Sequence, residues 1–133
     1  MPLPSVGGGF QLGDGNLNEI FLGEMADPQT ATATATLTAA QVTSGMLVAN
    51  PSTTAASYTL PTVALTEAVL TNAKIGSTFD VVLVNLGTSS GAVTVLVGTG
   101  WTIVGNAVVA ITSSARFTAR KNDVGAWTLY RVA

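Results

Sequence analysis

Residues 78–133 carry a regular succession of short β-type runs, and this succession constrains the fold more than any other feature of the chain. The runs are rich in β-branched and aromatic residues, and most of them end at a Gly, Asn or Ser turn. The predicted strands are Thr78–Val84, Ala92–Val97, Trp101–Val104, Ala107–Thr112, Ala115–Arg120 and Ala126–Val132. This spacing favours an all-β sandwich or barrel over βαβ units, which would place a helix between successive strands.

Charged side chains make up only 9% of the 133 residues, whereas roughly 25% is usual in a soluble domain. A chain of this length corresponds to one domain, so Thr, Ser, Gly and Ala must cover much of its surface. A β-rich body with so few charges either aggregates edge to edge or buries much of its surface against partner chains. We favour burial against partners and therefore predict a protein that works by association.

The few charges are segregated along the chain. No Lys or Arg precedes Lys74, whereas five of the seven acids do: Asp14, Glu19, Glu24, Asp27 and Glu67. The remainder of the chain is net positive. Opposite charges on two segments can steer one copy onto another, although so few charges also segregate by chance.

Residues 1–29 differ in composition from the body predicted at residues 30–133. Pro2, Pro4 and the glycines at 7–9 oppose regular structure, which predicts an extended N-terminal arm. The arm nevertheless holds more apolar side chains than a solvated linker would keep. They are Phe10, Leu12, Leu17, Ile20, Phe21, Leu22 and Met25. We therefore expect the arm to lie on a protein surface, either on its own body or on a neighbouring subunit.

The segment after the arm combines a strand pattern with a helix start. Thr30–Thr38 alternates Thr with Ala or Leu, which predicts a strand or a spacer between arm and body. Thr38 and Gln41 have the spacing of a capping box, and Gly45 supplies a left-handed stop. One or two helical turns are therefore predicted between Thr38 and Gly45.

Two further strands and a second short helix are predicted before residue 78. Met46–Ala49 and Ser57–Leu60 are expected to be strands on either side of a turn at Asn50-Pro51-Ser52. Apolar residues at helical spacing predict a helix over Val63–Ala73. The face expected to pack on the sheets consists of Leu65, Ala68 and Val69.

The C-terminal hairpin follows from the alternation of its two strands. A five-residue loop at Lys121–Gly125 predicts a register in which large apolar residues share the inner face. The inner pairs are Phe117 with Leu129 and Ala119 with Trp127. The outer pairs are Arg116 with Tyr130 and Thr118 with Thr128.

The residue types that carry most catalytic and metal chemistry are missing. His and Cys are absent, which excludes imidazole-assisted nucleophiles and imidazole or thiolate metal ligands. Paired carboxylates remain, but most acids lie in the Gly-rich arm, which would position them poorly. We therefore predict no catalytic residues, no metal site and no cofactor, and the chain is not expected to be an enzyme.

Asp14–Glu19 begins like a calcium-binding loop. Such a loop needs Gly at its sixth position and Glu at its twelfth, where this chain has Glu19 and Met25. We interpret the segment as a turn held by Asx side chains.

Two surface features are candidates for binding. Arg116, Arg120 and Lys121 on one hairpin could contact an acidic partner, although a solvated strand face is the simpler interpretation. The formal net charge of −2 argues against nucleic-acid binding. Trp101 follows a Gly turn and is the candidate surface-binding aromatic, whereas alternation turns Trp127 inward.

Neither a membrane partner nor export is expected. No apolar run approaches the roughly 18 residues of a membrane-spanning helix. Met1–Phe10 lacks the basic and apolar regions of a secretory signal.

A set of ordered pieces covering about three quarters of the chain resembles a known group of proteins. The pieces are Leu37-Thr38-Ala39-Ala40-Gln41 with Gly45, Tyr58-Thr59-Leu60-Pro61-Thr62, Gly76-Ser77-Thr78-Phe79-Asp80 running to Asn85, Gly98-Thr99-Gly100-Trp101, Gly105, and Arg116 with Arg120-Lys121 leading to Trp127-Thr128-Leu129-Tyr130-Arg131. From Leu37 to the C-terminus the sequence resembles the small β-sandwich domains of tailed-bacteriophage virions, found as capsid decoration (cement) proteins and in head-fibre proteins.

The resemblance implies a jelly-roll-like or related β-sandwich with an extended N-terminal arm that anchors it to the capsid. It further implies a homotrimer that is assembled in the host cytoplasm, sits on the outer capsid and locks neighbouring major capsid protein subunits. No catalytic residues are implied. The alternative is a receptor- or glycan-binding knob of a phage head or tail fibre, because the same β-body occurs in fibre-like proteins.

Overall fold

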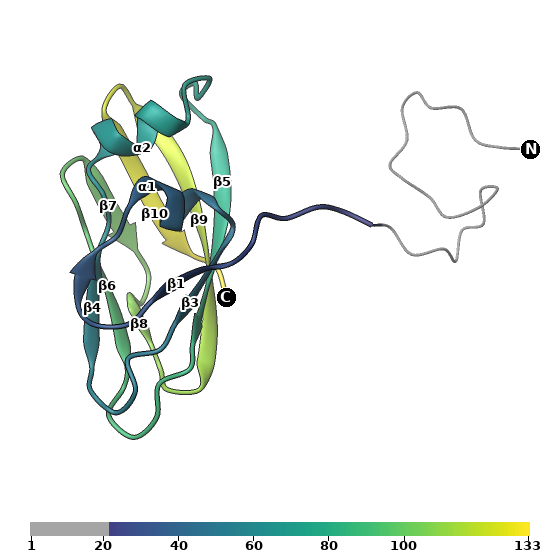
Figure 1. Ribbon diagram of the computed structural model, residues 1–133. Helices are drawn as coiled ribbons and strands as arrows, with labels where there is room; N and C mark the ends of the chain where they lie inside the picture. The colour runs from purple at the N-terminus through teal and green to yellow at the C-terminus, as the bar shows by residue number, and fades with distance from the viewer. Residues whose placement is uncertain (1–21) are drawn as a thin grey trace, which may run out of the picture.

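Strands alternate between two facing sheets in the computed structural model, which describes residues 22–133 (Figure 1). The strands are β1 (Gln29–Ala31), β2 (Ala35–Thr36), β3 (Met46–Ala49), β4 (Ala56–Thr59), β5 (Thr78–Asn85), β6 (Val93–Leu96), β7 (Trp101–Val104), β8 (Val108–Val109), β9 (Ser113–Asp123) and β10 (Ala126–Arg131). The helices of the same residues are α1 (Ala39–Thr43) and α2 (Val63–Val69). One sheet has the order β1-β3-β5-β9-β10-β7 and the other β2-β4-β6-β8.

The first six strands wind as a coil that places one strand in each sheet per turn. As a result, β1, β3 and β5 are parallel neighbours in one sheet, and β2, β4 and β6 are parallel neighbours in the other. Later strands pair differently: β9 is antiparallel to β5 and β10, β8 is antiparallel to β6, and β7 is parallel to β10. The predicted mostly β, two-sheet body with short helices is confirmed. The jelly roll, which is built from antiparallel strands, is not confirmed.

The hydrophobic core lies between the inner faces of the two sheets. Alternate residues of β5 and β9 point inward from one sheet, and Tyr58, Val93 and Val95 point inward from the other. Tyr58 is fully buried, and its hydroxyl donates to the carbonyl of Thr32 at 2.8 Å. The polar tip of the ring therefore has a partner and also ties down the chain between β1 and β2.

Asn85 is a buried polar residue that joins the loops at the end of the sheets away from α2. It is 1% exposed. Its Nδ2 donates to the carbonyls of Gly91, Val109 and Ala110 at 3.0, 3.1 and 3.1 Å, and its Oδ1 accepts from the Gly87 N–H at 2.8 Å. One side chain thus connects β5, the β5–β6 loop and the end of β8. Asn85 was not among the residues for which a structural role was predicted from the sequence.

Of the two alternatives left open for Thr30–Thr38, a strand or a spacer, one continuous strand is not what forms. The segment forms the end of β1 in one sheet and β2 in the other, with a bend between them. A strand cannot continue straight when the chain has to cross the core from one sheet to the next. The bend is held by Tyr58 and by the Ser57 N–H, which donates to Oγ1 of Thr34 at 3.1 Å.

The first helix begins and ends as predicted. The Thr38 N–H donates to Oε1 of Gln41 at 2.8 Å, and the Gln41 N–H donates to Oγ1 of Thr38 at 3.2 Å, which completes the capping box. Gly45 has a φ of +98°, a left-handed conformation that suits glycine.

The second helix is shorter than predicted and buries a different face. It ends at Val69, and it buries Val63 and Thr66, whereas the predicted face of Leu65, Ala68 and Val69 is exposed. The helix begins at the cap formed by Thr62, whose Oγ1 accepts from the Leu65 N–H at 3.3 Å. The Thr66 hydroxyl bonds to the Thr62 carbonyl, so a polar residue can occupy the buried side without an unsatisfied group.

The C-terminal hairpin has the predicted faces and a different register. Ala119 lies opposite Leu129 and Thr118 opposite Tyr130, two residues away from the predicted pairing. The strands continue to Asp123 and resume at Ala126, with an irregularity next to Trp127, so the loop is shorter than predicted. A shift of two residues leaves every side chain on the same face. Burial of Phe117, Ala119, Trp127 and Leu129 is therefore confirmed.

The predicted strand at Ala107–Thr112 is reduced to β8, two residues long. Thr112 has a φ of +48°, which is rare for a β-branched residue and turns the chain into β9. The long strand β9 then pairs with both β5 and β10.

Candidate functional site

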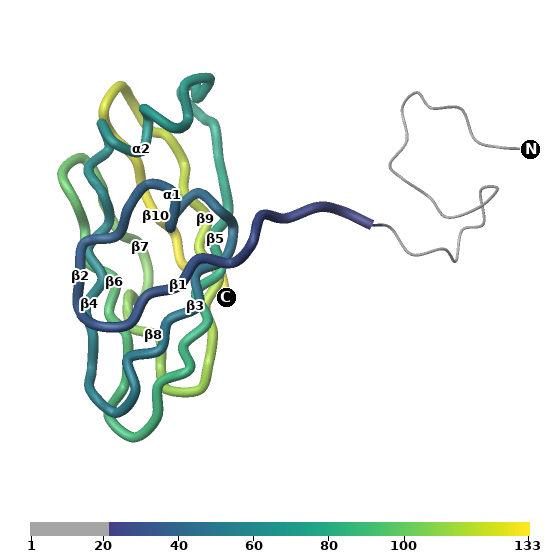
Figure 2. The backbone as a smooth tube through the Cα atoms, in the orientation of Figure 1, coloured from purple at the N-terminus to yellow at the C-terminus, as the bar shows by residue number. Residues whose placement is uncertain are grey.

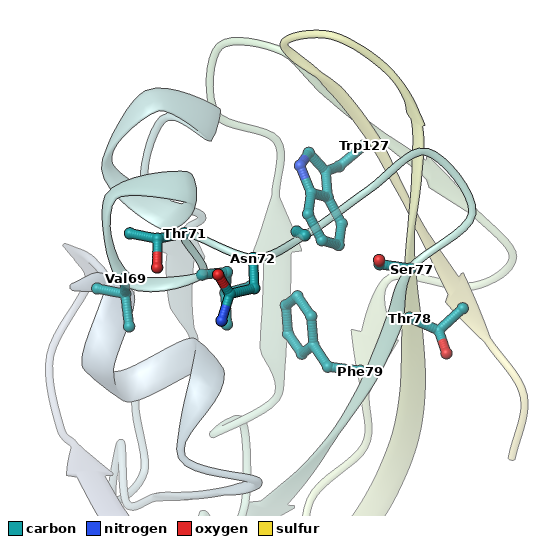
Figure 3. A pocket seen from close by; sticks show the side chains of 9 residues that line it. Val69, Thr71, Asn72, Ser77, Thr78, Phe79 and Trp127 are labelled. Atoms are coloured by element: carbon teal, nitrogen blue, oxygen red, sulfur yellow. The ribbon is translucent and has the colours of Figure 1, made fainter.

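A pocket of about 320 Å³ opens at the end of the molecule that carries α2. Its walls come from the end of α2, the loop to β5 and the start of β5 and β10, and they include Val69, Asn72, Ser77, Thr78, Phe79 and Trp127. Figure 3 shows the rings of Phe79 and Trp127 close together, with Asn72 on the loop beside them. The pocket thus combines an aromatic wall with a rim of small polar side chains.

The aromatic wall is the outer part of a stack that continues into the core. The ring centroids of Phe79 and Trp127 are 5.5 Å apart, and those of Trp127 and Trp101 are 5.8 Å apart. Trp101 comes next to Trp127 because β7 pairs with β10 in a register that places these two residues opposite each other. Tilted aromatic pairs at such distances stabilise a fold beyond the burial of their area.

The prediction that Trp101 is a surface-binding aromatic is wrong. Its side chain is 5% exposed, and its Nε1 donates to the Pro61 carbonyl at 2.9 Å. The neighbouring glycine turn does not expose the ring, because the ring N–H is bonded to Pro61 and the ring lies against Trp127. Phe79 and Trp127 are the aromatic residues that line the pocket. Phe79 was not among the predicted site residues; strand alternation could have placed it, because it precedes the buried Val81 by two residues and therefore shares its face.

Glu67 on α2 receives two hydrogen bonds behind the pocket. Its Oε1 accepts from Nζ of Lys121 at 2.9 Å and from Nε1 of Trp127 at 3.0 Å. These two donors, Lys121 first, lower the pKa of Glu67 below its ordinary value because they stabilise the charged carboxylate. Lys121 is therefore occupied within its own chain, and its side chain is 12% exposed. The prediction that it contacts an acidic partner is wrong for this residue.

The lowered pKa of Glu67 gives a testable pH dependence. An unfolded glutamate titrates at about 4.3, so the stabilisation from Glu67 is present above that pH and is lost as the pH falls through the lower folded pKa. The difference in free energy of unfolding between the wild type and Glu67→Gln is expected to be largest near neutral pH and to shrink in acid. Urea unfolding followed by tryptophan fluorescence at several pH values measures it. Asp27→Asn, in the exposed N-terminal segment, is the control. A difference between wild type and Glu67→Gln that does not vary with pH would contradict the role of the Glu67 carboxylate.

Arg116 and Arg120 lie on the outer face of the larger sheet. Nη2 of Arg116 is 3.2 Å from Oδ2 of Asp80, and Oδ1 of Asp80 accepts from the Thr118 hydroxyl at 2.6 Å. The Thr118 hydrogen bond is the main reason that the pKa of Asp80 is lowered, with Arg116 adding to it. Arg120 bonds only to Asn122 among the described residues, at 3.3 Å. Contact of Arg116 and Arg120 with an acidic partner stays a prediction.

The four-stranded sheet presents an uncharged face. No charged residue lies between Asp27 and Glu67 or between Asp80 and Arg116 in the sequence, so β2, β4, β6 and β8 contain none. Leu96 lies opposite Thr59, and Val108 lies opposite Thr94. Leu96 and Val108 are 44% and 41% exposed. The charged residues of the described chain thus belong to the larger sheet, to the region around α2 or to the N-terminal segment. One of them, Arg131 of β10, reaches the edge of the four-stranded sheet, where its guanidinium donates to the Val108 carbonyl of β8.

The described part of the predicted arm runs along little of the body. Leu22 and Met25 are both 58% exposed, although the Met25 side chain passes over Gly45. Residues 22–28 lead away from the sheets (Figure 2). The other predicted anchoring residues lie outside the described residues: Phe10, Leu12, Leu17, Ile20 and Phe21.

Residues 22–133 contain no group of three or more acidic side chains that could hold a metal ion. In the same part of the chain, no helix has both the length and the apolar character needed to cross a membrane.

Comparison of the chain with protein-family models, with curated proteins and with solved structures gave no match.

Proposed function

We propose that this chain is a structural protein of a virion. It decorates the outer capsid as a homotrimer and stabilises contacts between major capsid protein subunits. The observation that carries the proposal is the four-stranded sheet, whose strands contain no charged residue and whose outer face exposes Leu96 and Val108. Surfaces that remain in water are usually rich in charged side chains, and exposed apolar patches mark interaction sites. A sheet face without charges is therefore suited to burial against another protein.

The proposed mechanism is the addition of several weak contacts. Each copy contributes a sheet face and an arm, and three linked copies convert later binding events into intramolecular ones. Ligands that bind only the assembled state stabilise it by mass action, so such contacts would hold the capsid against outward pressure. In this proposal the body is a jelly-roll-like sandwich of two facing sheets. It differs from a jelly roll in its first six strands, which are parallel within each sheet and not antiparallel.

The distal arm residues are proposed to anchor the trimer to the capsid. Replacing Phe10, Leu12 and Leu17 together with serine is expected to abolish co-sedimentation with capsids and to leave the trimer intact, because only the apolar contacts of the arm are removed. The matched control replaces the same residues with methionine, which keeps them apolar and should keep binding. Capsid binding by the serine variant at the wild-type level would contradict the proposal.

A receptor- or glycan-binding knob of a phage fibre is the second candidate. The pocket favours it, because Phe79 offers an aromatic surface and Asn72 an amide at its rim, a combination that suits sugar recognition. Phe79→Ala would then abolish binding to a glycan or host-cell surface without releasing the protein from virions. Unchanged cell binding by that variant would remove this candidate.

A further inference from the structure

We propose that the pocket beside α2 receives the acidic, apolar segment at residues 19–25 of a second copy of this chain. The inference rests on the proposed self-assembly of several copies and is independent of their attachment to a capsid. It assigns an occupant to the pocket and a binding role to the proximal arm. The distal residues Phe10, Leu12 and Leu17 remain for the capsid.

The pocket suits an apolar side chain carried by an extended peptide. Its volume of about 320 Å³ is at the small end of the range of ligand pockets, roughly 300–1,000 Å³. Around it, Leu65, Val69 and Ile75 are 59%, 55% and 60% exposed. Val69 lines the pocket, Leu65 lies one helical turn before it on α2, and Ile75 lies in the loop between α2 and β5. Exposed apolar side chains on these elements are suited to a contact with another protein. Asn72 can bond to the backbone of a peptide that lies across the rim.

Charge favours this particular segment as the occupant. Lys74 follows the pocket residue Ala73. Gly76 lies in the same loop, and Nη2 of Arg120 is 3.8 Å from the point where a side chain at Gly76 would begin. Among residues 22–133, neither cation forms an ion pair, whereas the neighbouring Lys121 is neutralised by Glu67. The segment reads Glu19-Ile20-Phe21-Leu22-Gly23-Glu24-Met25, with an acid on each side of an apolar run. Such a peptide places carboxylates near the cations when an apolar side chain enters the pocket.

The course of the described chain favours a second copy over the same body. Residues 22–28 lead away from the sheets, and Leu22 is 58% exposed (Figure 2). From Gln29 to Phe21 the extended chain reaches on the order of 25 Å, far enough to cross to a neighbouring subunit. Because the arm and the pocket are different surfaces, their contact is head-to-tail, and a head-to-tail contact can close into a ring. An exchange of arms among three copies is such a ring.

Cysteine cross-linking tests the proposal. The natural chain has no Cys, so only the introduced cysteines can form a disulfide. Phe21→Cys is placed in one chain and Val69→Cys in a second chain of different mass, and the two are co-expressed and oxidised. Docking raises the local concentration of the two thiols to the millimolar range. The expected yield of the mixed two-chain product is therefore at least about tenfold above that of a control with Leu96→Cys in place of Val69→Cys. Leu96 is also exposed but lies on the other sheet.

A charge swap supplies the second readout. Lys74→Glu is expected to lower the cross-link yield severalfold, and adding Glu19→Lys should restore it, because the pair has opposite charges again. A yield equal to the Leu96 control overturns the proposal. When both cysteines are placed in the same chain and it is mixed with cysteine-free chain, a disulfide that forms only within that chain overturns it as well. A saccharide that occupies the pocket, with cross-linking at the control level, would assign the pocket to glycans. Strong cross-linking in a protein that does not bind capsids would instead leave this inference standing and refute the capsid proposal.

Discussion

Replacing Asn85 with aspartate is expected to lower the free energy of unfolding by about 4 kcal/mol or more, one of the largest effects that a single substitution produces. The Asn85 amide donates to the carbonyls of Gly91, Val109 and Ala110 from a position that is 1% exposed. A carboxylate has the same shape but no N–H groups, so it would face three carbonyl oxygens without a donor. Buried unpaired charges and unsatisfied acceptors are both costly.

Urea unfolding measured by circular dichroism gives this free energy. Asn50→Asp is the matched control, because Asn50 is exposed and its Oδ1 accepts from the Ser52 N–H at 3.3 Å, a hydrogen bond that a carboxylate keeps. The control is expected to stay within about 0.5 kcal/mol of the wild type. If Asn85→Asp were as stable as Asn50→Asp, the conclusion that Asn85 holds the loops together at this end of the sheets would be incorrect.

Trp127→Ala is expected to cost about 3–5 kcal/mol, the usual range for truncating a buried tryptophan. Trp127 is 1% exposed and lies between Phe79 and Trp101. Its Nε1 also donates to Glu67, so the substitution removes a hydrogen bond together with the central ring of the stack. The wall of the pocket is lost at the same time.

The control for this substitution is Tyr130→Ala, on the opposite face of the same strand. Tyr130 is partly exposed, so its truncation is expected to cost clearly less than that of Trp127. Unfolding in urea, followed by circular dichroism because the main fluorophore is altered, compares the two variants. Equal losses would show that the stack contributes nothing beyond the strand itself.

Features set by local periodicity could be predicted from the sequence. Two-residue alternation placed Phe117, Ala119, Trp127 and Leu129 inside, and this result survives even though the hairpin register differs. The register itself depended on an irregularity next to Trp127 that alternation does not reveal. The first helix was predictable because its capping box and its stop are encoded within a few residues.

Features set by distant contacts could not be predicted. Trp101 is buried because β7 pairs with β10 and because the Pro61 carbonyl accepts its N–H, neither of which is visible near residue 101. The face of α2 is reversed because Thr66 can be buried with its hydroxyl bonded to the preceding turn. The pocket combines α2, the following loop and β10, so only the fold brings its residues together.

The central claim is that this chain, with its uncharged sheet face, works as an assembled subunit. Light scattering at micromolar concentration tests it most directly. A homogeneous species at three times the 13.4 kDa chain mass is predicted. A stable, fully folded species at 13.4 kDa under the same conditions would contradict the claim.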